Sequence, residues 1–228
     1  MTKLSVRLED PALEAKEREQ LAFLRSAAAT RLSLYMEQFK DVLHDPEAVG
    51  KVHILGGHPL RYHEETLVDI TDDTDDKIYE VIGDFFPGAS DVTKDAFKTA
   101  IDQNLKGIVD EALVGGKKVQ AVYVIPENGA IVRVDAIYWK YGFSEAGIIG
   151  SHKNVFCCLF AKSIVDHTQI SLDDLIGLVS EQSGGAEVKE VIDEIKEIWE
   201  KVQGLDQEAV FTEYCKNHAL SRHDAAQA

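Results

Sequence analysis

The stretch from Lys118 to Asp166 constrains the fold most, because it reads as consecutive β-strands joined by turns. The expected strands are Val119 to Ile125, Ala130 to Tyr141 and Asn154 to Val165. The first turn, Pro126-Glu127-Asn128-Gly129, contains an Asn-Gly pair, which supplies the positive φ that a tight hairpin needs. The stretch therefore predicts an antiparallel meander.

The second of these strands alternates with a period of two. Arg133 and Asp135 fall on one of its faces, which predicts a half-buried strand. Such a pair either lines a polar cleft or faces water. The pattern favours water.

The third strand is apolar on both faces from Val155 to Ala161, which is typical of a strand covered on both sides. We therefore expect it near the centre of the sheet. Its even-numbered face carries Phe156, Cys158 and Phe160, whereas its odd-numbered face carries Cys157 among smaller side chains. The smaller face predicts either closely packed helices or room for another group.

Helical periodicity flanks the sheet in sequence on both sides. An apolar stripe follows Asp10-Pro11 and predicts one long helix, or two with a break near Ser26. The stripe consists of Leu21, Leu24, Ala28, Leu32, Tyr35, Phe39 and Leu43. Further helices are expected from Asp91 to Leu113, Ser171 to Ser180, Glu187 to Gln203 and Asp206 to Asn217, and short strands at Lys3 to Leu8 and Val52 to Leu55.

These elements predict a single α/β (α+β) domain over residues 1–228, a mostly antiparallel sheet flanked by amphipathic helices, with a frayed tail from about residue 219. The net charge of −16 disfavours binding to nucleic acid and to anionic membrane surfaces. Three cysteines, two of them adjacent, do not form a disulfide framework, and the N-terminus lacks the apolar run of a secretory signal. We expect a protein made in the cytoplasm, with release by another route left open.

The adjacent Cys157 and Cys158 are the most specific candidates for a chemical function in the sequence. On a strand their thiols face opposite sides, so they cannot form a redox pair or bind a metal together. A buried apolar strand also raises a thiol pKa, which weakens the case for a nucleophile. The favoured interpretation is that both cysteines are small core residues. A nucleophilic thiol is the second, and a thiol that carries an acyl group into an apolar cavity is the third.

The acidic run from Asp69 to Glu80 offers two kinds of metal site. As a calcium loop it lacks the usual central Gly, because Thr74 stands there. As a DDxxD run, Asp72, Asp73 and Asp76 resemble the magnesium-diphosphate site of class I terpene synthases. The pattern favours a plainer interpretation, in which the carboxylates begin a helix and interact with its dipole.

A second candidate metal group is formed by His53, His58, His63, Glu64 and Glu65. Its spacing matches neither a helix face nor a compact zinc pattern, so the sequence favours histidines in solvent-exposed loops.

Three short stretches carry a resemblance to known families: Val6-Arg7-Leu8-Glu9-Asp10-Pro11, the Asp91 to Leu113 helix, and the aromatic-Cys step Phe156-Cys157. With the order of elements over Lys3 to Asp166, they resemble the Cyt-type δ-endotoxin and volvatoxin cytolysins. That resemblance implies a single α/β domain whose helical layers open over the sheet on contact with phospholipid.

The layout is also similar to the Evf type of virulence factor, in which a cysteine carries a palmitoyl group held inside the protein. This resemblance implies that Cys157 or Cys158 is acylated, and the smaller odd-numbered face favours Cys157.

The leading hypothesis is a lipid- or acyl-associated protein of the cytolysin or virulence-factor kind. Its partners would be a lipid, an apolar small molecule or a membrane, with oligomers left open. A covalent fatty acyl group, and Mg or Ca at the acidic run, are the cofactors considered. The candidate acyl-attachment or cavity residues are Cys157, Cys158, Phe156, Phe160, Tyr123, Arg133 and Asp135.

The rival hypothesis is an enzyme that acts on an apolar substrate in a cavity over the sheet. It would use magnesium-diphosphate chemistry at Asp72, Asp73 and Asp76, or cysteine-dependent acyl transfer. A third hypothesis is an interaction module without a ligand.

Overall fold

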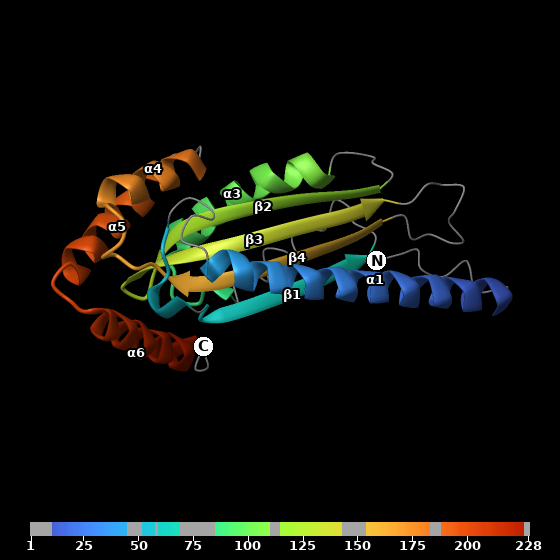
Figure 1. Cartoon of the computed structure of the whole chain (residues 1–228), viewed down its shortest axis with the longest axis horizontal. Helices are drawn as coiled ribbons and strands as arrows, with labels where there is room; N and C mark the ends of the chain where they lie inside the picture. The colour runs from blue at the N-terminus through green and yellow to red at the C-terminus, as the bar shows by residue number, and fades with distance from the viewer. Residues whose placement is uncertain are drawn as a thin grey trace.

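A four-stranded antiparallel sheet lies at the centre of the fold (Figure 1). The computed structural model describes residues 11–44, 52–57, 59–68, 85–109, 115–142, 154–182 and 188–225. The strands are β1 (Arg61–Val68), β2 (Gly115–Glu127), β3 (Ala130–Gly142) and β4 (Asn154–Ile164), and they lie in the order β1-β4-β3-β2. The predicted meander and the central place of β4 are both confirmed.

The turn between β2 and β3 has the backbone that its sequence predicts. Asn128 has a φ of 53° and Gly129 a φ of 77°, and the pairing closes with Glu127 opposite Ala130. Glycine and asparagine adopt this left-handed region most readily, which fixes the register of the hairpin.

The edge strand β1 was not predicted, and a strand at Val52 to Leu55 was predicted wrongly. Ile54 makes an isolated bridge with Val165, and Leu55–Gly57 forms a 3-10 turn, η1. Instead, β1 pairs with β4, with Thr66 opposite Cys157. Its sequence, Arg-Tyr-His-Glu-Glu-Thr-Leu-Val, is polar because an edge strand needs few apolar side chains.

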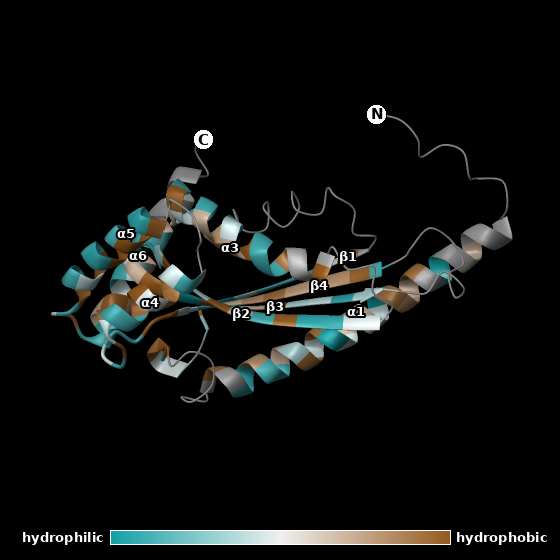
Figure 2. Cartoon of the chain, turned by 90° about the horizontal axis from the view of Figure 1, so that it is seen from above, coloured by the Kyte–Doolittle hydropathy of each residue, from teal (hydrophilic) through white to brown (hydrophobic). Residues whose placement is uncertain are grey.

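Helices cover the two faces of the sheet unequally (Figure 2). The single helix α1 (Pro11–His44) lies along one face, and α3 (Asp91–Val109) and α5 (Val188–Val202) pack against the other. Two further helices, α4 (Leu172–Gln182) and α6 (Gln207–Ala225), lie with α5 near the end of the sheet that holds the β2–β3 turn. Ser171 caps α4 as predicted, whereas α6 continues beyond its predicted end at Asn217.

The long N-terminal helix is unbroken, which settles the choice between one helix and two. Its predicted apolar stripe faces inward, since Leu24, Ala28, Leu32, Tyr35, Phe39 and Leu43 are all buried. In Figures 1 and 2 its N-terminal part extends past the end of the strands.

The buried apolar side chains form two separate clusters. The main core lies between the sheet and α3, α4, α5 and α6. The second cluster, here called the α1-face cluster, contains Ala28, Leu32, Tyr35, Phe39 and Leu43 from α1 and Ile137, Trp139, Val155, Cys157, Leu159 and Ala161 from the sheet. Among the described residues, α1 is therefore the one helix that contributes to this cluster.

Candidate functional site

The two adjacent cysteines lie on opposite faces of β4, as predicted. Cys157 belongs to the α1-face cluster and Cys158 to the main core, and each is 1% exposed. Cys215, on α6, is exposed. The chain therefore carries one thiol under α1, one under the other helices and one at the surface.

The surroundings of Cys157 suppress its reactivity. Burial raises the pKa of its thiol from 9.0 to about 11, although the Thr66 hydroxyl, which lies 3.8 Å from Sγ, lowers the pKa slightly. Burial also raises the pKa of Cys158. A thiol with a raised pKa is a poor nucleophile at neutral pH, so the geometry does not favour cysteine-dependent acyl transfer in the closed structure.

This pKa gives a testable pH dependence. Between about pH 9 and pH 11 the folded state keeps the Cys157 proton that the unfolded chain has released, so stability falls as pH rises through this window. Between pH 8 and pH 10.5 the wild type should lose about 2 kcal/mol more unfolding free energy than Cys157→Ala. Urea unfolding at both pH values measures the difference, and an identical pH dependence of the two chains would contradict it.

The aromatic residues predicted with the cysteines are core residues. Phe156, Phe160 and Tyr123 are buried on the main-core face. The Tyr123 hydroxyl accepts a hydrogen bond from Asn104 and lies 3.4 Å from the Tyr138 hydroxyl, and burial raises its pKa to about 12. Neither these rings nor the thiols line the pockets at the β2–β3 turn, beside α4 or beside α6. Acylation of Cys157 or Cys158 stays a prediction.

The expectation that Arg133 and Asp135 face water is wrong. Arg133 is 3% exposed and Asp135 0%, and two hydrogen bonds of 2.7 and 2.8 Å join the guanidinium to the carboxylate. A further nitrogen of Arg133 donates to the Val52 carbonyl, which ties the segment after α1 to the sheet. Burial raises the pKa of Asp135, and the ion pair with Arg133 opposes that shift. Because the guanidinium of Arg133 and the carboxylate of Asp135 compensate each other, β3 can be buried on this face as well as on its apolar face.

A second buried ion pair, which was not predicted from the sequence, lies on the opposite face of the sheet. Lys162 Nζ lies 2.9 and 3.1 Å from the carboxylate oxygens of Glu127 and donates to the Phe85 carbonyl at 2.8 Å. Both charged side chains are 1% exposed. The Tyr214 hydroxyl and the Gly88 amide also donate to Glu127. The sequence contains one sign of this pair: Lys162 lies within the largely apolar strand β4, and a buried ammonium requires a partner.

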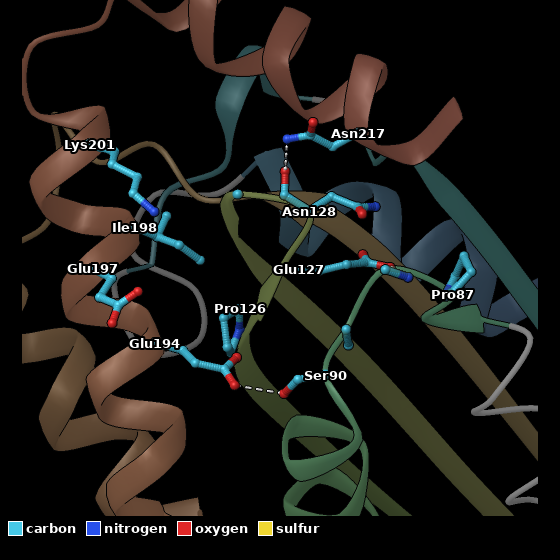
Figure 3. Close-up of a pocket in the computed structure, with 13 residues that line it drawn as sticks. Pro87, Ser90, Pro126, Glu127, Asn128, Glu194, Glu197, Ile198, Lys201 and Asn217 are labelled. Carbon is cyan, nitrogen blue, oxygen red and sulfur yellow. Dashed lines mark hydrogen bonds between the residues drawn. The ribbon is translucent and has the colours of Figure 1, made fainter. Parts of the chain in front are cut away.

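A polar pocket of about 610 Å³ lies beside this pair, between the β2–β3 turn, α5 and residues 87–90 (Figure 3). Its groups mainly hold elements together. Glu194 of α5 accepts hydrogen bonds from Ser90 and Thr93 at the start of α3, and Asn217 of α6 donates to the Asn128 carbonyl. The pocket therefore marks a junction at which α3, α5 and α6 are fixed to the hairpin.

Several predicted metal ligands are not described by the structure. The acidic run, including Asp72, Asp73 and Asp76, lies within residues 69–84, outside the described residues, and so does His58. His63, expected in a loop, belongs to β1, with Glu65 on the same face and Glu64 on the other. In the part of the chain that the structure describes, no three His, Cys, Asp or Glu side chains are placed to hold a metal ion.

Of the helices that the structure describes, none combines the length and the apolar character that crossing a bilayer requires.

Comparison with known proteins found no family model, no curated protein and no solved structure that matches this chain. The resemblance to cytolysins and to the Evf type of virulence factor therefore stays a prediction.

Proposed function

We propose that this protein associates with lipid by releasing α1 from the sheet, which exposes the α1-face cluster to the apolar phase. The supporting observation is the division of the buried side chains into two clusters, one of which has α1 as its only helix among the described residues. Release of α1 uncovers the sheet side of that cluster without separating any pair of elements in the main core.

The contacts that hold α1 on the sheet are easier to break than those that hold the other helices, so α1 is the helix that is released. On its inner face α1 packs through apolar side chains, which lose little when an acyl chain replaces the sheet as their neighbour. At the sheet edge, Lys118 of β2 donates to Gln38 at 3.1 Å in an exposed position, and such contacts contribute little. On the opposite face, α6 contacts the buried Glu127 and α5 holds Ser90.

The segment that follows α1 remains fixed when α1 moves. Arg133 donates to the Val52 carbonyl, the Asp166 amide donates to the His53 carbonyl at 2.9 Å, and Ile54 bridges to Val165. These contacts involve the sheet and not α1. The helix is therefore the moving part in this proposal, and residues from Val52 onward stay with the sheet.

The exposed surface of α1 also supports its movement from the sheet to lipid. Phe23 is 66% exposed and Leu34 is 46% exposed on this helix. Large exposed apolar side chains suit a helix that inserts shallowly into the boundary between head groups and acyl chains. The overall negative charge favours a zwitterionic surface over an anionic one.

A matched pair of variants tests the proposal. Phe39 (0% exposed) lies in the α1-face cluster and Phe97 (2% exposed) in the main core, and each Phe→Ala change should cost about 3–5 kcal/mol. Phe39→Ala weakens α1 docking specifically, so it should raise binding to phosphatidylcholine vesicles by at least about tenfold. Phe97→Ala should leave binding near the wild-type level.

Vesicle flotation at a temperature where circular dichroism shows both variants folded gives the measurement. Equal binding by the two variants would mean that general loss of stability drives association. Absence of binding by every chain would refute lipid association itself.

A further inference from the structure

A second apolar feature lies outside the α1-face cluster, in a groove between α6 and the segment before β1. The groove has a volume of about 570 Å³, within the usual range for ligand sites of roughly 300–1,000 Å³. Its apolar lining is Leu55, Pro59, Leu60, Ile164 and Phe211, and its polar lining includes Gln207 and Glu208. Phe211 is 44% exposed, so an aromatic ring stands at the surface beside the groove.

Both walls of the groove are fixed to the end of the sheet that holds the β2–β3 turn. On one side, the Leu60 amide donates to the Lys162 carbonyl at 2.6 Å. On the other side, Gln207 of α6 donates to the Asp166 carboxylate at 2.8 Å, and Tyr214 donates to Glu127 at 3.1 Å. The groove is therefore preformed, and binding there requires little ordering of the chain.

The charge at the rim selects the polar end of an occupant. Glu208 lines the groove, and Asp206, which caps α6 through the Ala209 amide, precedes it in the chain. The whole chain carries a net charge of −16. An alkyl chain that ends in a carboxylate or sulfate would meet repulsion here, whereas a quaternary ammonium would be attracted.

We propose that this groove holds one acyl chain of a lipid whose head group carries a quaternary ammonium, with Phe211 against the chain and Glu208 near the ammonium. The inference rests on the proposed lipid association and adds the class of lipid that is recognised. It also assigns head-group selection to α6, which the proposed release of α1 does not involve.

The test uses the full chain with two single-chain probes below their micelle concentrations: dodecylphosphocholine and dodecanoate. Titration calorimetry should give one site for dodecylphosphocholine and at least tenfold weaker binding of dodecanoate. Phe211→Ser should weaken dodecylphosphocholine binding at least tenfold. Leu205→Ser is the matched control, because Leu205 is similarly exposed at 40% and does not line the groove.

Equal binding of the two probes, equal effects of the two variants, or no binding would overturn the groove proposal. So would a self-associated wild-type chain that Phe211→Ser converts to a monomer, because the groove would then be an interface between copies. If dodecylphosphocholine binds as expected but vesicles do not release α1, the groove stands and the proposed function fails. The reverse result would overturn the groove and leave the proposed function in place.

Discussion

Replacement of Lys162 by methionine should lower the free energy of unfolding by about 3–5 kcal/mol, the usual cost of breaking a buried ion pair from one side. Methionine fills a similar space but removes the ammonium that lies 2.9 and 3.1 Å from Glu127. Only the hydroxyl of Tyr214 and the amide of Gly88 among the described hydrogen bonds would then compensate a carboxylate that is 1% exposed. Urea unfolding at neutral pH measures the loss as a shift of the midpoint.

Two further variants make this expectation specific. Adding Glu127→Gln to Lys162→Met should recover much of the loss, because the amide carries no charge, its oxygen can accept from the Gly88 amide, and its NH2 group can donate to the Tyr214 hydroxyl. Lys196→Met removes an ammonium that lies 3.4 Å from Asp193 at the surface, and should cost less than about 1 kcal/mol. A loss of unfolding free energy as small for Lys162→Met as for Lys196→Met would contradict the conclusion that Lys162 compensates the buried charge of Glu127.

The hydrogen bonds that Glu127 receives from outside the sheet distinguish the two faces. Through Glu127, the main-core face joins β2, β4, α6 and the turn at Gly88 in one buried polar cluster. Opening that face would remove the Tyr214 hydroxyl of α6 from the buried Glu127 carboxylate, which costs a hydrogen bond to a charged group. On the α1 face, by contrast, the buried Arg133 makes its described hydrogen bonds to Asp135 and to the Val52 carbonyl, and neither of these partners lies on α1.

Local patterns predicted much of the fold. The Asn128-Gly129 turn, the inward stripe of α1 and the central position of β4 each follow from a short stretch of sequence whose geometry depends little on distant residues. The cap of α3 is equally local, because Ser90 Oγ accepts from the Thr93 amide.

The features that were not predicted from the sequence share a physical cause. In each, residues far away in the sequence supply the partners of its polar groups. The polar strand β1 forms because β4 supplies its pairing partners about a hundred residues later. Arg133 is charged and was therefore expected to be exposed, yet besides its neighbour Asp135 the distant Val52 carbonyl accepts a hydrogen bond from it inside the protein. Lys162 and Glu127 meet across the sheet end in the same way, and no periodicity in either stretch reveals the pair.

The adjacent cysteines provide a direct measure of α1 release. Cys157 lies under α1 and Cys158 under the opposite helices, so two single-cysteine chains report on the two faces separately. The Cys158→Ala/Cys215→Ala chain retains Cys157, and the Cys157→Ala/Cys215→Ala chain retains Cys158. Removal of Cys215 is necessary because this thiol is exposed in the closed structure.

The expected effect on Cys157 is large. With a pKa of about 11, its thiolate fraction at pH 8 is about one in a thousand, and an exposed thiol with the ordinary pKa of 9.0 has about one in ten. Release of α1 into contact with water therefore raises the thiolate fraction about a hundredfold, and because a thiolate of lower pKa is a weaker nucleophile, the labelling rate rises about tenfold before any gain in steric access is counted.

The measurement that tests the central claim most directly is the rate of thiol labelling at pH 8 with and without phosphatidylcholine vesicles. Release of α1 predicts that vesicles raise the rate at least about tenfold for Cys157 and leave Cys158 near its original rate. An equal rise at both cysteines would indicate unfolding of the whole chain, and no rise at Cys157 would show that α1 stays on the sheet; either result would contradict the claim.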